Sequence, residues 1–93
     1  MIYSEQYGET VTAEQDQEFC KVRSPASVES MGSNPCISVA VYSNQLKMAW
    51  MVHMSRHPDN TDELHEMLSD VSEETGGGGM TKSLIIGGDG NYT

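Results

Sequence analysis

Two neighbouring stretches in the middle of the chain carry its strongest hydrophobic pattern. Residues 36–42 (Cys-Ile-Ser-Val-Ala-Val-Tyr) alternate β-branched with small side chains, and residues 47–54 (Lys-Met-Ala-Trp-Met-Val-His-Met) are almost continuously apolar. Both patterns are typical of β-strands, and the polar residues 43–46 between them have the length of a hairpin connection. Because a strand with one wet face would alternate with polar residues, we expect both faces of this hairpin to be covered.

A helix is predicted after the hairpin. Apolar residues recur there at the i, i+3, i+4 and i+7 spacing of one helix face: Leu64, Met67, Leu68 and Val71. Asn60 is a favourable N-cap residue, and Glu63 follows it by three positions, as in a capping box. The four glycines at 76–79 predict the end of the helix, because glycine loses more backbone entropy than any other residue in a regular element.

Shorter patterns on either side complete the set of predicted elements. Residues 18–23 favour a strand that ends at Ser24-Pro25, since proline interrupts a regular element. Residues 82–86 favour a last strand before the glycines at 87–90. Residues 1–17 are polar and weakly patterned, so the sequence predicts no element there and allows them to be loosely ordered.

The predicted architecture is one α+β domain spanning residues 1–93. The order strand, strand, strand, helix, strand fits a central β-hairpin in a small mixed sheet with one amphipathic helix packed on it. Trp50 and the methionines of the second hairpin strand are expected to pack its core. The 93 residues, 37% of them hydrophobic, suffice for a single core.

The charge of the chain disfavours one class of partner. Five basic and fourteen acidic residues give a net charge of -9, which repels phosphate backbones. We therefore expect no nucleic-acid partner, whereas a basic protein partner suits this surface. No apolar run approaches the roughly 20 residues of a membrane helix, and the first residues do not resemble a signal peptide. No membrane association and a cytoplasmic location are predicted.

The two cysteines, Cys20 and Cys36, are too few for a disulfide scaffold. Reduced thiols are the expectation in the cytosol, although the sequence leaves a disulfide between these two open.

One candidate catalytic group emerges from the hairpin. Cys36 opens its first strand and His53 lies near the end of its second, and these two ends are neighbours in an antiparallel pair. A nucleophilic cysteine needs such a partner, because the thiolate is the reactive form and a nearby imidazolium lowers the pKa of the thiol. Ser30, shortly before the cysteine, is placed to orient the imidazole as a third member.

These residues resemble the chemoreceptor glutamine deamidases of the CheD family. The resemblance lies in residues 30–36 (Ser-Met-Gly-Ser-Asn-Pro-Cys), the hairpin, and residues 50–54 (Trp-Met-Val-His-Met). As in that family, a hydroxyl residue precedes the cysteine by six positions and a histidine follows it by seventeen. The resemblance implies a cysteine hydrolase in which Cys36 attacks a protein glutamine amide, His53 is the base and Ser30 orients it.

The chain departs from this family at three places, the mildest of which is that the family's serine-or-threonine position is a serine here, Ser30. Pro35 precedes the cysteine and has no N–H, so an oxyanion hole must use other donors, such as the Cys36 amide. The family also continues with another helix and more strands beyond Gly87-Gly88, so the resemblance implies a reduced relative lacking the C-terminal part. A second copy of the chain would cover the open sheet edge. The alternative is a non-catalytic protein-interaction module, as a homodimer, that keeps the hairpin core.

Histidines and carboxylates downstream of the hairpin suggest a second chemistry, a zinc site. The residues concerned are His53, His57, His65, Asp59, Glu63 and Glu66. Pro58 interrupts this segment, so the helical His-x-x-x-His geometry is not available and solvated loop histidines are expected. The glycines at 76–79 and 87–90 match no phosphate-binding fingerprint. No metal and no cofactor are therefore predicted.

Overall fold

The computed structural model describes residues 1–30, 37–55, 61–76 and 81–87 of the protein. Within these ranges the regular elements, in chain order, are the strands β1 (Ile2–Ser4), β2 (Thr10–Ala13), β3 (Cys20–Arg23), β4 (Ser27–Ser30), β5 (Ile37–Ser43) and β6 (Met48–Met54), the helix α1 (Asp62–Thr75) and the strand β7 (Thr81–Gly87).

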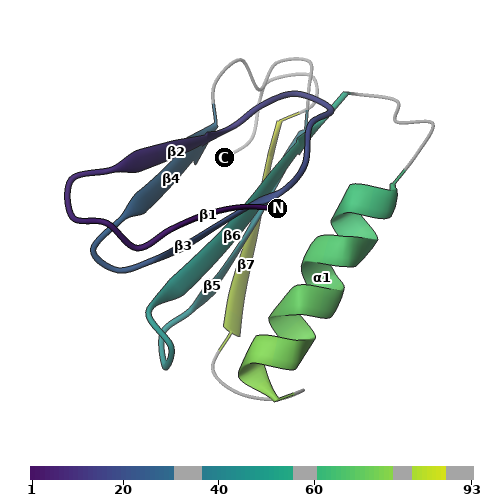
Figure 1. Ribbon diagram of the computed structural model, residues 1–93. Helices are drawn as coiled ribbons and strands as arrows, with labels where there is room; N and C mark the ends of the chain where they lie inside the picture. Colours follow the sequence, from purple (N-terminus) through teal and green to yellow (C-terminus); the bar gives the residue numbers. More distant parts are fainter. Residues whose placement is uncertain (31–36, 56–60, 77–80, 88–93) are drawn as a thin grey trace.

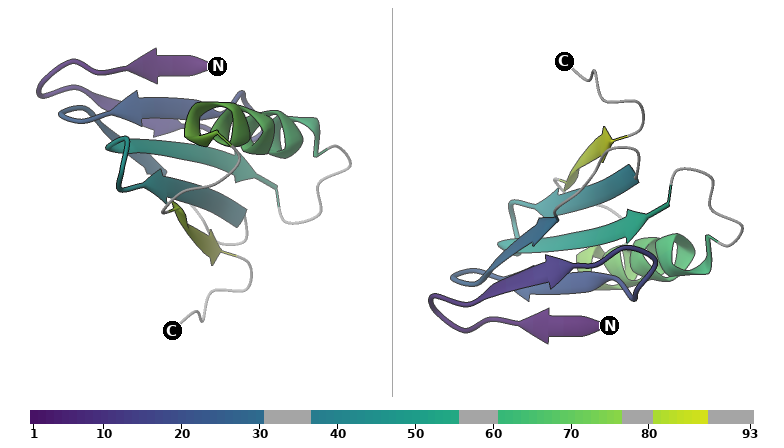
Figure 2. Two further views of the ribbon diagram at one scale, coloured as in Figure 1. Left: turned by 90° about the horizontal axis from the view of Figure 1, so that it is seen from below. Right: turned by 90° about the horizontal axis from the view of Figure 1, so that it is seen from above.

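The strands form one large and one small sheet (Figure 1). The five-stranded sheet has the order β1-β3-β6-β5-β7, with β1 and β7 at its two edges (Figure 2). β1 runs parallel to β3 and the other neighbours are antiparallel, so the sheet is mixed. β2 and β4 pair in parallel as a separate small sheet. The predicted α+β class, with a central hairpin (β5–β6) in a mixed sheet and one helix, is confirmed.

The five-stranded sheet is covered on both faces, as the apolar hairpin strands predict. Figure 1 shows α1 on one side of this sheet and β2 and β4 on the other. The helix-side core consists of Phe19, Val39, Val41, Met48, Trp50, Val52, Met54, Met67 and Val71. A second, inter-sheet core consists of Val11, Ala13, Cys20 and Val22. Successive side chains of β5 and β6 therefore alternate between the helix and the small sheet.

The helix α1 begins at a different residue than the sequence predicts, but it ends where the sequence predicts. Thr61 occupies the N-cap position, so the cap predicted at Asn60 is wrong. The Glu63 carboxylate does not close a capping box; it accepts the N–H of Phe19 at 2.8 Å and so joins the first turn to the start of β3. The end is as predicted, with Gly76 in the left-handed conformation that glycine adopts without strain.

The apolar stripe of α1 is narrower than its spacing predicts. Met67 and Val71 are buried in the helix-side core and Leu64 packs partly against it, whereas Leu68 is 44% exposed.

Among the described residues, no helix has the length and hydropathy that a membrane crossing requires.

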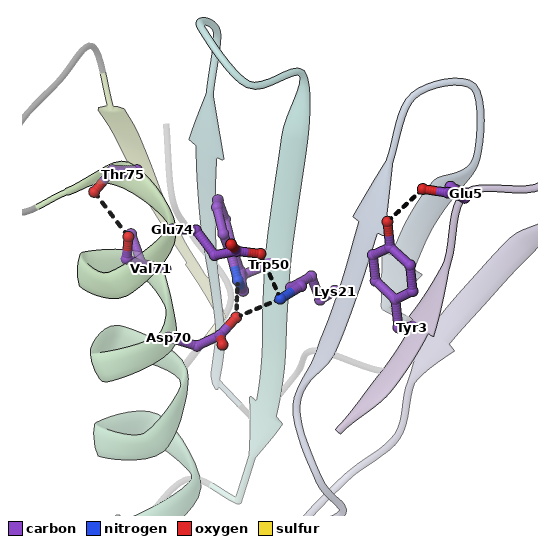
Figure 3. A network of polar contacts seen from close by, with 8 residues as sticks. All are labelled: Tyr3, Glu5, Lys21, Trp50, Asp70, Val71, Glu74 and Thr75. Carbon is purple, nitrogen blue, oxygen red and sulfur yellow. Dashed lines mark hydrogen bonds and ion pairs between the residues drawn. The ribbon is translucent and has the colours of Figure 1, made fainter.

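A charged network joins α1 to the sheet (Figure 3). The Nζ of Lys21 on β3 lies 2.9 Å from Asp70 Oδ2 and 2.7 Å from Glu74 Oε2. Trp50 Nε1 on β6 donates to the same Asp70 oxygen at 2.8 Å. On its other side, Lys21 Nζ lies 5.6 Å from the centre of the Tyr3 ring, a cation–π distance.

The network favours the charged form of both Lys21 and Asp70. Burial alone would lower the pKa of Lys21, but the hydrogen bonds and charges of Glu74 and Asp70 outweigh it, and the pKa is raised. Burial would likewise raise the pKa of Asp70, but the Trp50 indole and the Lys21 ammonium outweigh it, and the pKa is lowered. The contact therefore stabilises the folded state as an ion pair.

Three strands were not predicted. β1 and β2 lie in residues 1–17, where no element was expected, and β4 begins two residues after Pro25. Each has three or four residues, and β1 and β2 pair in parallel with strands that come later in the chain. Short strands depend on their neighbours more than on local propensity.

The turn between β5 and β6 contains one strained residue, and this makes a prediction. Lys47 has a φ of 56°, a left-handed conformation that side chains with a Cβ adopt at a cost. Replacement by glycine removes this cost but adds entropy to the unfolded chain. We expect Lys47→Gly to raise the free energy of unfolding by about 0.5–1 kcal/mol, measured by urea denaturation. Asn44→Gly, in the same turn and without a positive φ, is the control and should not stabilise.

Candidate functional site

The candidate site lies on the face of the five-stranded sheet that is turned towards the small sheet. In the register of β5 and β6, Ser38 lies directly opposite His53, so both side chains project from the same face. Their neighbours Val39 and Val52 belong to the helix-side core, which places Ser38 and His53 on the other face. Both residues are almost completely buried, Ser38 at 2% and His53 at 3% exposure.

The small sheet adds a third polar residue. Ser30, the last residue of β4, places its Oγ 2.7 Å from Ser38 Oγ and 3.2 Å from His53 Nδ1. A continuous chain of hydrogen-bonding atoms, the Ser38–Ser30–His53 chain, therefore crosses between the two sheets. It fixes the imidazole ring through one of its two nitrogens.

The backbone of His53 is fixed as well. Gln15, just after β2, forms an isolated bridge with His53, and the N–H of Asp16 donates to the His53 carbonyl at 2.8 Å. Asp16 has a φ of 57°, which short polar residues tolerate best, and its Oδ1 accepts the N–H of Ser55 at 3.0 Å. The segment after β2 thus holds the end of β6 against the small sheet.

The second ring nitrogen of His53 has no such partner. Nε2 is buried and has no hydrogen-bond partner among the described residues. A buried polar atom without a partner costs stability, so its presence needs an explanation. A general base provides one: it is held in place through one nitrogen and keeps the other for the reacting proton.

The predicted nucleophile lies outside the described residues, as do residues 31–35, which include Pro35. Cys36 directly precedes Ile37, and Ile37 lies opposite Met54, the residue after His53. The pairing of Cys36 with His53 remains a prediction, whereas the contact of Ser30 with His53 is present.

The other cysteine is unsuited to nucleophilic chemistry. Cys20 is a free thiol without measurable exposure, and its Sγ lies 3.5 Å from the Thr12 carbonyl, to which it donates. Burial, together with the nearby Glu18 carboxylate, raises the pKa of the Cys20 thiol. A buried thiol with a raised pKa is inert. Cys20 therefore provides an internal reference for the reactivity of Cys36.

The zinc alternative can be assessed only in part. His57 and Asp59 lie outside the described residues. In the remaining ranges, no three histidine, cysteine, aspartate or glutamate side chains come together to hold a metal ion. Glu63, one of the carboxylates considered for zinc, instead accepts the Phe19 N–H.

Comparisons of the chain with known protein families, with curated proteins and with solved structures find no significant match. The functional interpretation therefore rests on the geometry of this site and on the spacing of its residues.

The contribution of Ser38 was not predicted from the sequence. A signal was present, because Ser38 is a polar residue in the middle of an otherwise apolar strand. Its meaning depends on the strand register, which places it opposite His53 and within reach of Ser30. A polar residue inside a strand with two covered faces should be paired with another polar group, and this rule could have identified it.

Proposed function

We propose that the protein is a cysteine-dependent amidohydrolase of the CheD-like type that acts on glutamine side-chain amides in proteins. The observation that carries this proposal is the state of His53: Ser30 holds its Nδ1 at 3.2 Å, while its buried Nε2 has no partner among the described residues. This is the arrangement of a positioned general base, and the spacing of Ser30, Cys36 and His53 matches the deamidase pattern.

In the proposed reaction Cys36 is the nucleophile and His53 transfers the protons. His53 Nε2 takes the thiol proton of Cys36, and the thiolate attacks the amide carbon of the glutamine side chain. The carbon–nitrogen bond breaks, the imidazolium gives its proton to the leaving ammonia, and a thioester remains. Water, deprotonated by His53, then attacks the thioester and releases glutamate and the free thiol. No cofactor is needed.

Charge sets the substrate class of this proposal. With a net charge of -9, the chain would attract segments of proteins with basic surfaces and repel nucleic acids. We place the protein in the cytoplasm, where a reduced Cys36 persists, and expect it to act as a homo-oligomer.

The proposal predicts a reactive thiol at Cys36. The rate of alkylation by iodoacetamide, measured against pH by mass spectrometry, should report an apparent pKa of Cys36 well below the free-thiol value of about 8.5. In His53→Ala this reactivity at pH 7 should fall by about tenfold or more, because the thiolate loses its imidazolium partner. Cys20 should react far more slowly in the same samples, since it is buried.

A matched control removes a different histidine. His65 on α1 is exposed, and His65→Ala should leave the reactivity of Cys36 unchanged.

A glutamine analogue bearing a chloroketone at the amide position should label Cys36 faster than the shorter asparagine analogue does. If Cys36 proves no more reactive than Cys20, or is insensitive to His53→Ala, the hydrolase proposal is wrong.

One observation favours the alternative, a protein-interaction module. The N-terminal segment exposes four apolar or aromatic side chains on or near the edge strand β1, namely Met1, Ile2, Tyr3 and Tyr7. β1 pairs with β3, and among the described strands it has no neighbour on its other side. A partner strand could add there. An inert Cys36 would make this the leading function.

A further inference from the structure

Ser38 does not belong to the Ser30, Cys36, His53 pattern, yet it is part of the site. It is 2% exposed, lies opposite His53, and contacts Ser30 Oγ at 2.7 Å. A buried hydroxyl costs stability unless it is hydrogen-bonded, and an apolar residue would suit this strand better. The position of Ser38 therefore requires an explanation of its own.

When the Ser30 hydroxyl proton is used within the Ser38–Ser30–His53 chain, the protons of this chain can be ordered in two ways. Ser30 has one hydroxyl proton and two neighbours within hydrogen-bond distance, so it can donate to only one of them. In the first order, His53 donates from Nδ1 to Ser30, and Ser30 donates to Ser38. In the second order, Ser38 donates to Ser30, and Ser30 donates to Nδ1. The neutral ring carries its proton on Nδ1 in the first order and on Nε2 in the second.

We propose that Ser38 is a positioning residue that selects the first order and keeps the proton of neutral His53 on Nδ1. The inference rests on the proposed hydrolase, because Nε2 must carry a lone pair to take a proton from the thiol. Ser38 supplies the acceptor for the Ser30 hydroxyl. Without that acceptor, Ser30 would satisfy its proton by donating to Nδ1, and the ring proton would move to Nε2.

The first order also suits the charged ring that forms once Nε2 has taken the thiol proton. An imidazolium donates from both nitrogens, so Nδ1 continues to donate to Ser30 after Nε2 has taken a proton. Neither serine has to reorient between the neutral and the charged ring. In the second order, Ser30 would have to turn its hydroxyl away from Nδ1 each time.

The test is the tautomer of His53 in its neutral form, read from the ring nitrogens by long-range ¹H–¹⁵N NMR at a pH high enough for the ring to be uncharged. We expect the Nδ1–H tautomer in the wild-type protein, a shift towards Nε2–H in Ser38→Ala, and recovery in Ser38→Thr, which keeps the hydroxyl. The matched control is Ser43→Ala, the same change on the same strand. Ser43 is 1% exposed and accepts the Leu46 N–H at 3.3 Å, so its loss should leave the ring unchanged.

Cys36 alkylation, measured on the same variants at pH 7, separates this inference from the proposed function. Ser38→Ala should lower the rate by about threefold to tenfold, the range that one lost hydrogen bond supplies, and Ser43→Ala should not. An Nε2–H tautomer in the wild type, or an unchanged tautomer in Ser38→Ala, would overturn the role of Ser38. The wild-type tautomer tests this role even if Ser38→Ala does not fold. A tautomer shift beside an inert Cys36 would support Ser38 and remove the hydrolase.

Discussion

Replacing Trp50 with alanine should lower the free energy of unfolding by about 3–5 kcal/mol. Trp50 has no measurable exposure, belongs to the helix-side core and sits on β6, which lies between β3 and β5 in the sheet. Alanine would leave a cavity lined by the sheet and α1 that close packing cannot fill. It would also remove the indole N–H that donates to Asp70.

This loss is large relative to the whole stability of the protein. A domain of 93 residues is expected to be stable by about 5–14 kcal/mol, so Trp50→Ala would remove a substantial part of it. Urea unfolding followed by circular dichroism is the suitable measurement, because the variant has no tryptophan left to report by fluorescence. Trp50→Phe keeps a ring in the core and should lie between the wild type and Trp50→Ala.

The matched control for Trp50 is an aromatic residue on the surface. Tyr7 is 87% exposed, so Tyr7→Ala should change the free energy of unfolding by no more than about 0.5 kcal/mol. Similar urea midpoints for Trp50→Ala and Tyr7→Ala would mean that the helix does not pack on β6 as described. Because β6 also carries His53 on its other face, Trp50→Ala should weaken the candidate site only through stability.

The elements with strong local patterns could be predicted from the sequence. The hairpin, the helix and the last strand are long, and their apolar spacing indicates their type directly. The near-continuous apolar runs of residues 36–42 and 47–54 also predicted that both faces of the hairpin are covered. The small sheet that covers one of these faces could not be foreseen, because β2 and β4 have four residues each and pair across the chain in parallel.

In the candidate site, too, some features could be predicted from the sequence and others depend on contacts between distant parts of the chain. That Cys36 and His53 share one end of the hairpin remains a prediction, made from strand direction alone. The role of Ser30 was predicted from its position shortly before Cys36 and from the resemblance to a family, because no rule of spacing brings the end of β4 onto β6. Ser38 needed the strand register, since a shift by one residue would turn its side chain towards α1. The cap predicted at Asn60 was wrong: Thr61 is the N-cap residue, and Glu63 accepts the N–H of Phe19 in another element, a contact that local sequence does not indicate.

Removal of the Asp70 carboxylate should have the second largest effect. We expect Asp70→Ala to lower the free energy of unfolding by about 2–4 kcal/mol. Two contacts disappear together. Lys21 loses one of its two carboxylate partners, and the N–H of the buried Trp50 loses its acceptor. A hydrogen bond to a charged group contributes about 1.5–3 kcal/mol, and a buried donor left unpaired costs about 1–3 kcal/mol. The expected loss is smaller than the sum of these two contributions, because Asp70 is partly exposed and Lys21 keeps its contact with Glu74.

Asp70→Asn separates these two contributions. The amide oxygen can still accept the Trp50 N–H, so only the charge is removed. We expect Asp70→Asn to lower the free energy of unfolding by about 1–2 kcal/mol. The matched control is Glu66→Gln, which neutralises an exposed carboxylate on the same helix and should change stability by no more than about 0.5 kcal/mol. Equal losses in Asp70→Asn and Glu66→Gln would show that the ion pair with Lys21 contributes nothing.

The pH dependence of these variants follows from the direction of the pKa shifts. Because the folded-state pKa of Asp70 is lowered, its contribution is present above the unfolded pKa of about 3.9 and is lost as the pH falls through the folded value. Because the folded-state pKa of Lys21 is raised, its contribution is present below about 10.4 and is lost as the pH rises through the folded value. The difference in unfolding free energy between the wild type and Asp70→Asn should therefore be constant from about pH 5 to 9. It should shrink in acid, where Asp70 is protonated, and in strong base, where Lys21 is neutral. A difference that persists unchanged into strong acid would rule out an electrostatic origin.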